Sequence, residues 1–151
     1  MGFAMNDSEQ NVPHKSLRQS QFQCLADSLP ICLLQKDANG RPKFANHAYF
    51  KFHGQAPGQI LELNSSGIFP HSDVEQFRLS DLDVLQRGEE IHETCRFVTT
   101  DGRERWLERI KGPMRDADGA IAGIQILFWD VTDRRQRENN HNHERSLLHT
   151  L

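Results

Sequence analysis

The sequence predicts an α+β fold, a five-stranded antiparallel sheet with its helices on one face. The length of 151 residues suits one ordinary domain. Over residues 91–129 apolar and polar residues alternate with period two, and Asp-Gly turns divide the segment into three strands. Before them come two short strands and several helical segments, so strands and helices are grouped as in α+β proteins.

Residues 1–14 are polar and are expected to form a flexible lead-in to a domain over 15–130. A helix is predicted over 15–28, where Phe22, Leu25 and Leu29 form one narrow apolar stripe at helical spacing. Such a stripe suits packing on a sheet and on a twin helix. We therefore predict a homodimer with these three residues in its interface.

Two short strands are predicted next, over 31–35 and 42–45, joined by an Asn-Gly turn within 37–40. Asn46 is a good N-cap for a short helix with Tyr49 and Phe50 on its inner side, and His53 on that side is left open as an alternative to the surface. A longer helix is predicted over 72–87, because Gly88 follows its last residue.

Three antiparallel strands are predicted over 91–100, 103–114 and 120–129, because Asp-Gly connections this short leave no room for a crossover. Asp130 or Thr132 can then cap an exit helix. The segment 131–151 is predicted to be the start of a linker helix, since it stays polar for several turns.

Composition excludes several classes of protein. Lys and Arg number 18 against 21 Asp and Glu, a net charge of −3, which disfavours binding to nucleic acid or to an anionic membrane surface. No apolar run is long enough to insert into a bilayer, and no secretory signal opens the chain. The three cysteines are too far apart for a CxxC metal site. We expect a cytoplasmic protein.

Eight short segments carry a family resemblance over about residues 25–138. They read, in order, Asp27–Pro30, Asp37–Arg41, Phe44–Ala48, Ile68–Pro70, Asp81–Glu89, Thr100–Trp106, Pro113–Gly119 and Asp130–Arg135. Each is weak alone, but together, at these spacings, they resemble the PAS domain, the sensory box of bacterial signalling proteins.

The resemblance implies a sensory and dimerisation module that regulates a linked effector. Effectors of such modules are typically histidine kinases, GGDEF/EAL cyclic-di-GMP enzymes or transcription regulators. The module holds a small ligand between sheet and helices or simply dimerises, and it passes its signal through the exit helix. Asp130 and Thr132 stand at that junction.

The candidate pocket residues are those expected between sheet and helices: Leu34, Phe50, Phe69, Phe77, Asp81, Val84, Cys95, Phe97, Ile124, Ile126 and Phe128. Asp81 is the most informative, because it shares a helix face with apolar residues and a charge there needs a partner. It either meets a polar group of a ligand or bonds backbone N–H groups or an arginine, such as Arg96 or Arg109.

No cofactor or metal is predicted. The position where heme-binding relatives carry their histidine ligand holds Phe77, and the Gly-x-Asn-Cys-Arg stretch of flavin photosensors is missing. A non-classical heme or a non-covalent flavin stays open as the alternative. His47, His53 and His71 are interpreted as surface residues.

An enzyme is disfavoured, although Cys95, His92 and Asp81 could in principle supply a nucleophile, a base and an orienting group. Cys95 and His92 are three residues apart on one strand and therefore point to opposite faces. The tail histidines His141, His143 and His149 lack the i, i+4 spacing of a helical metal site.

Overall fold

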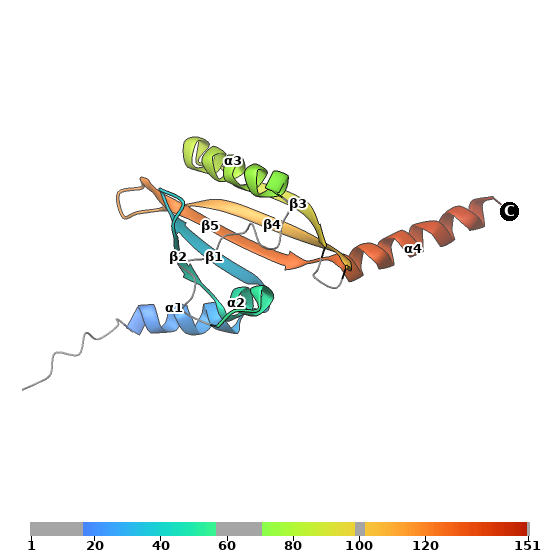
Figure 1. Cartoon of the computed structure of the whole chain (residues 1–151), viewed down its shortest axis with the longest axis horizontal. Coiled ribbons are helices and arrows are strands. Elements are labelled where there is room, and N and C mark those ends of the chain that lie inside the picture. Colours follow the sequence, from blue (N-terminus) through green and yellow to red (C-terminus); the bar gives the residue numbers. More distant parts are fainter. Residues whose placement is uncertain (1–16, 57–70, 99–101, 151) are drawn as a thin grey trace, which may run out of the picture.

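The computed structural model describes residues 17–56, 71–98 and 102–150. Five strands form one antiparallel sheet in the order β2-β1-β5-β4-β3, and the α+β prediction is confirmed (Figure 1). The elements are α1 (Leu17–Ser28), β1 (Cys32–Asp37), β2 (Pro42–Ala45), α2 (His47–His53), α3 (His71–Arg87), β3 (Ile91–Val98), β4 (Glu104–Arg115), β5 (Ile121–Asp130) and α4 (Thr132–His149).

Strand register divides the sheet into two faces. Lys111 is opposite Ile126, which is opposite Leu34, and the side chains of all three face α2 and α3. The core lies on this inner face and consists of Cys32, Leu34, Ala45, Tyr49, Phe50, Phe77, Val84, Phe97, Leu107, Ile124, Ile126 and Phe128. The central strand β5 thus supplies three residues to the core and pairs with both halves of the sheet.

The helix α1 differs from α2 and α3, because it flanks the sheet instead of covering the core. Its Phe22 ring packs against Phe44, with centroids 5.3 Å apart, and Phe44 alternates with the inward-facing Ala45 along β2. In Figure 1 α1 lies beside α2, below β1 and β2.

Asn46 fixes the connection between β2 and α2. Its fully buried side chain accepts from the N–H groups of Tyr49 and Leu33, and donates to the carbonyls of Ala26 and Ile31. The predicted N-cap is confirmed, and the same amide also ties α1 and β1 to the start of α2.

The helix α4 extends away from the sheet at the end of β5 (Figure 1). Thr132 does not cap this helix as predicted. Its hydroxyl accepts from the Trp106 N–H of β4 instead of a helix N–H. Asp130 does accept from the Thr132 N–H, the first of the helix. No helix in the described ranges is long and apolar enough to cross a membrane.

Candidate ligand-binding site

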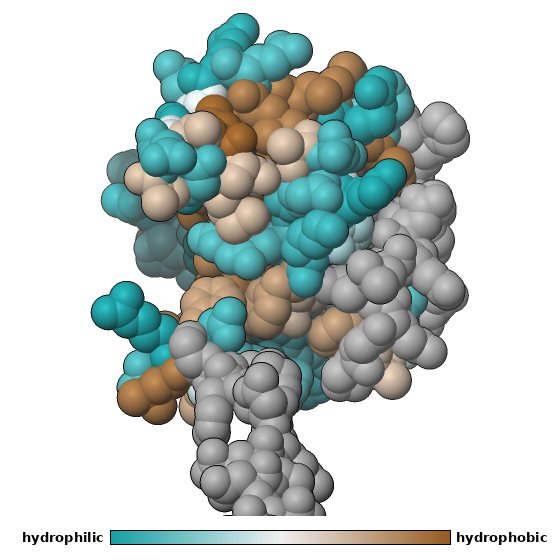
Figure 2. Space-filling view, turned by 90° about the vertical axis from the view of Figure 1, so that its left-hand side faces the viewer, coloured by the Kyte–Doolittle hydropathy of each residue, from teal (hydrophilic) through white to brown (hydrophobic). Residues whose placement is uncertain are grey.

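A cleft opens between α3 and the β1–β2 hairpin. Its volume is about 550 Å³, and its wall combines apolar residues with a few charged ones: Leu34, Lys36, Ala38, Asn39, Gly40, Pro42, Tyr49, Val74, Phe77, Arg78, Asp81, Leu82, Leu85 and Ile124. Figure 2 views the molecule from the left-hand side of Figure 1, and hydrophobic patches alternate with hydrophilic residues on this face.

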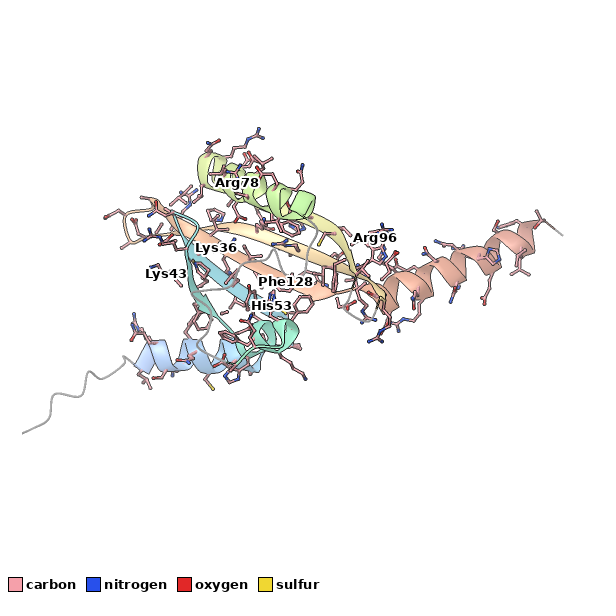
Figure 3. The ribbon with its side chains drawn as sticks, in the orientation of Figure 1. Lys36, Lys43, His53, Arg78, Arg96 and Phe128 are labelled. Carbon is pink, nitrogen blue, oxygen red and sulfur yellow. The ribbon has the colours of Figure 1, made fainter. Side chains whose placement is uncertain are left out.

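A smaller cavity of about 30 Å³ adjoins the cleft and shares four lining residues with it. Its full lining is Leu34, Lys36, Tyr49, His53, Phe77, Leu107, Arg109, Ile126 and Phe128. It is roughly the size of one or two water molecules. Figure 3 shows His53 of α2 and Phe128 of β5 lying close together there, and Lys36 between β1 and α3.

A buried charge cluster joins α3 to the sheet at the cleft. The Asp81 carboxylate accepts from Lys111 Nζ at 2.7 Å and from Lys36 Nζ at 2.8 Å. Lys111 is completely buried and also donates to the Ser80 hydroxyl and the Phe77 carbonyl. Asp81 therefore has ion-pair partners, as one of the open alternatives expected, but these are lysines and not the candidate arginines Arg96 and Arg109.

The pKa shifts reflect an excess of positive charge around Asp81. Burial acts to raise the pKa of Asp81, but the charges and hydrogen bonds of Lys111 and Lys36 outweigh burial and lower it. Burial and the nearby charge of Arg109 lower the pKa of Lys111. The negative charges of Asp81 and Glu93 act to raise it, but they do not outweigh these two effects. Nearby positive charge thus lowers the pKa of Asp81, whereas for Lys111 it adds to burial, which is the larger cause of the lowered pKa.

Arg109 is the cation of this site with no carboxylate partner among the described residues. It is only 8% exposed, and its Cζ lies 3.7 Å from the centre of the Phe77 ring. Its Nε and Nη1 atoms are buried without a hydrogen-bond acceptor. Glu93, its register partner on β3, lies instead near Lys111, with Oε2 at 3.7 Å from Nζ.

Two neutral polar groups complete the small cavity. Burial raises the pKa of Tyr49 to about 12, although the charge of Arg109 opposes this, and burial lowers the pKa of His53. His53 is half-buried and packs on Tyr49, with ring centroids 4.4 Å apart, whereas His47 is exposed. Of the two placements expected for His53, the inner side of α2 agrees with the structure and the exposed surface does not. His53 follows Tyr49 by four positions and shares its inner face.

The structure brings together six of the predicted pocket residues. The cleft or the cavity is lined by Leu34, Phe77, Asp81, Ile124, Ile126 and Phe128. Three others, Phe50, Val84 and Phe97, belong to the core without lining either space, and Cys95 packs against that core. Phe69 lies outside the described residues.

Sequence reasoning missed several residues of the site, among them Lys36, Tyr49, Arg109 as a cavity residue, and Lys111, which bonds Asp81. Strand alternation could have identified three of them. Lys36 is in phase with Leu34, and Arg109 and Lys111 are in phase with Leu107. The same alternation places Arg96 on the outer face, because Cys95 and Phe97 face inward.

The residues present do not suit the flavin photochemistry of light sensors. Of the cysteines, Cys24 is exposed on α1, Cys32 is buried on β1 and Cys95 lies on β3, and none lines the cleft or the cavity. Within the described segments, no group of three His, Cys, Asp or Glu side chains is placed to hold a metal ion.

The junction to α4 and the stripe on α1 lie away from the cleft. Asp130 also accepts from Arg105 Nε at 2.8 Å, and Arg135 of α4 stacks on Trp106 at 4.0 Å. On α1, Phe22 and Leu25 are 43% and 63% exposed, and Leu29 is partly buried. This exposed stripe remains a predicted interface.

Comparison with known proteins identifies the fold independently. Residues 26–136 match the family profile described as PAS fold. The biofilm dispersion protein BdlA of Pseudomonas aeruginosa is 25% identical over 147 residues, which cover 97% of this chain and 35% of BdlA. The chain therefore spans about a third of this curated relative.

Solved structures share the fold at lower sequence identity. An RNA-binding light-oxygen-voltage receptor gives a TM-score of 0.68 at 20% identity, over 99% of this chain and 42% of that one. The VqmA–ligand–DNA complex of Vibrio cholera gives 0.67 at 23% identity, over 76% and 52%. A PAS domain from Colwellia psychrerythraea gives 0.62 at 16% identity, over 76% and 97%.

Proposed function

Because this chain belongs to the PAS family, we propose that it is a sensory domain that binds a small molecule in the cleft beneath α3 and thereby regulates a linked effector. The observation that carries the proposal is the cleft itself. Its volume of about 550 Å³ falls within the range of small-molecule sites. Its apolar walls converge on a few charged groups, which is the usual composition of such sites.

The output would leave through α4, which follows β5 after a single residue, Val131. Since the chain covers only 35% of BdlA, we propose that an effector lies elsewhere in the parent protein. A histidine kinase, a GGDEF/EAL enzyme and a transcription regulator are the candidates. VqmA, solved with a ligand and DNA, is one protein in which this fold is found beside a DNA-binding function.

Two further proposals accompany this role. PAS domains are typically non-catalytic, and we propose the same for this domain. We also propose a homodimer through the exposed stripe of α1, whose Leu25 has no covering element among the described residues.

Ligand binding is tested by screening the full chain against a metabolite library by thermal melting. A ligand at 100 times its Kd should stabilise the fold by about 2.7 kcal/mol. Leu82→Trp places a large ring in the cleft wall and should weaken binding at least about tenfold. Gln86→Trp, one turn along α3 and outside the cleft lining, is the matched control. Equal affinity in both variants would contradict the proposed location.

Coupling to the effector is tested at the junction in the parent protein. Thr132→Ala removes the acceptor of the Trp106 N–H, at 2.8 Å, and loosens the base of α4 from β4. We expect the domain to stay folded and the ligand response of the effector to fall. A response equal to that of the wild type would show that this contact is not on the output route.

A further inference from the structure

Arg109 is the feature of the site that the fold alone does not explain. It is more than nine-tenths buried, lines the small cavity next to the cleft, and keeps two nitrogens, Nε and Nη1, without an acceptor. Leaving a buried charged donor unsatisfied is costly, and arginine stays protonated at all ordinary pH values. A hydrogen-bond acceptor for Arg109 is therefore expected in the ligand-bound state of the site.

The charges around Arg109 show what kind of acceptor is missing. Among the described residues around Asp81 and Arg109 there are three cations, Lys36, Arg109 and Lys111, and two carboxylates, Asp81 and Glu93. Both lysines bond Asp81, and Glu93 Oε2 lies 3.7 Å from Lys111 Nζ without a hydrogen-bond partner. Burial disfavours the charged forms of Tyr49 and His53, which line the same cavity from α2, so these described groups together carry one surplus positive charge.

We infer that the ligand of this domain is an anionic small molecule, an apolar body bearing a carboxylate that pairs with Arg109. The inference rests on the proposed function and names the ligand class for the same cleft. The carboxylate supplies both the acceptor and the negative charge, and arginine pairs with carboxylates through strong, charge-assisted hydrogen bonds. The apolar body fits the cleft wall next to the cavity, formed by Leu34, Val74, Leu82, Leu85 and Ile124.

A water molecule would be an incomplete substitute. The cavity of about 30 Å³ has room for one, and its oxygen could accept from Nε or Nη1. These two groups donate from different edges of the planar guanidinium, so one oxygen does not reach both. Water also leaves the surplus charge in place. The cavity is thus suited to the two oxygens of a single carboxylate that reaches in from the cleft.

The test compares acids with their uncharged amides, using hexanoate, benzoate, phenylacetate and indole-3-acetate, each beside its primary amide. Binding to the full chain is followed by titration of its backbone amide NMR signals. At least one acid should bind about tenfold or more tighter than its amide, because a charged hydrogen bond contributes that much. Arg109→Gln should remove this preference.

Arg96→Gln is the matched control, because Arg96 is an exposed arginine on the outer face that pairs with Glu104. It should keep the full preference for acids. If Arg109→Gln proves unfolded, the acid-to-amide ratio of the wild type decides the question alone.

The outcomes separate this inference from the proposed function. The inference of an anionic ligand would be overturned if the amides bind as tightly as their acids, or if Arg109→Gln leaves the affinity for the acids unchanged. The cleft would still be a binding site in either case. Absence of acid binding, together with a crystal structure of the ligand-free protein in which Glu93 pairs with Arg109, would overturn it as well. Absence of any shift at cleft residues, with the pairs and with the whole library, would contradict the proposed function itself.

Discussion

Replacing Asp81 with asparagine should destabilise the domain strongly, because Asp81 is the counterion of a lysine with no access to water. Lys111 is fully buried and its Nζ lies 2.7 Å from the carboxylate. Asparagine keeps the shape but loses the charge, and its NH₂ group would face one of two lysine donors. Removing one partner of a buried pair costs about 3–5 kcal/mol.

Two features place the expected loss near the lower end, at about 3 kcal/mol. Lys111 keeps its bonds to Ser80 Oγ, at 2.6 Å, and to the Phe77 carbonyl, at 3.0 Å. The side chain of Lys36 is 19% exposed and can be partly hydrated once Asp81 is neutral. Urea unfolding of the full chain measures the loss, which should lower the midpoint by about 1–3 M.

The pH dependence gives a second measurement on the same pair. The pKa of Asp81 in the folded protein lies below its ordinary value of 3.8. Its ion pairs therefore contribute fully above about pH 4, and their contribution is lost as the pH falls through the folded pKa. The difference in unfolding free energy between wild type and Asp81→Asn should accordingly shrink below pH 4.

Asp83→Asn is the control, because Asp83 lies on the same helix in an exposed pair with Arg87. Such a pair contributes about 0.3–0.5 kcal/mol. The reasoning is refuted if Asp81→Asn costs no more than about 1 kcal/mol beyond this control, a third of the expected loss, or if its cost is independent of pH.

Three further predictions concern stability and assembly. Gly123→Ala should cost about 1–3 kcal/mol or more, because its Cβ would lie 2.1 Å from the Lys36 carbonyl oxygen, whereas Gly112→Ala meets nothing closer than 3.9 Å and should be nearly neutral in thermal melting. Asn46→Ala should cost about 2–4 kcal/mol in urea unfolding, because four buried hydrogen bonds disappear; a cost of an ordinary cap, about 1 kcal/mol, would contradict this. Leu25→Asp should convert dimers to monomers in sedimentation while Ser20→Asp, on another side of α1, should not, and persisting dimers would place the interface elsewhere.

The order and type of the elements could be predicted from the sequence because turns and periodicity are local signals. Asn39-Gly40 and the Asp-Gly turns fixed the antiparallel neighbours, and Asn46 marked the start of α2. Element ends were less accurate: the first strand was expected over 31–35 and lies at Cys32–Asp37. Strand ends depend on pairing with β5, which is set by the packed sheet.

The site was predicted in part. Helical spacing was enough to show that Asp81 faces the core and needs a partner. Which partner it has depends on the relation of α3 to β1 and β4, and that is a property of tertiary packing. Thr132 is similar: a threonine at a helix start usually caps the helix, but here its hydroxyl accepts from the Trp106 N–H of β4, at 2.8 Å.

The direct passage from β5 into α4 has a mechanical consequence. β5 borders the cavity with Ile126 and Phe128, and only Val131 separates its last residue from the helix. With 18 residues, α4 is a stiff rod about 27 Å long, so a tilt of about 5° at its base moves its far end by roughly 2 Å. A strand displacement too small to disturb the core packing is thereby enlarged into a change of position that a neighbouring domain could register.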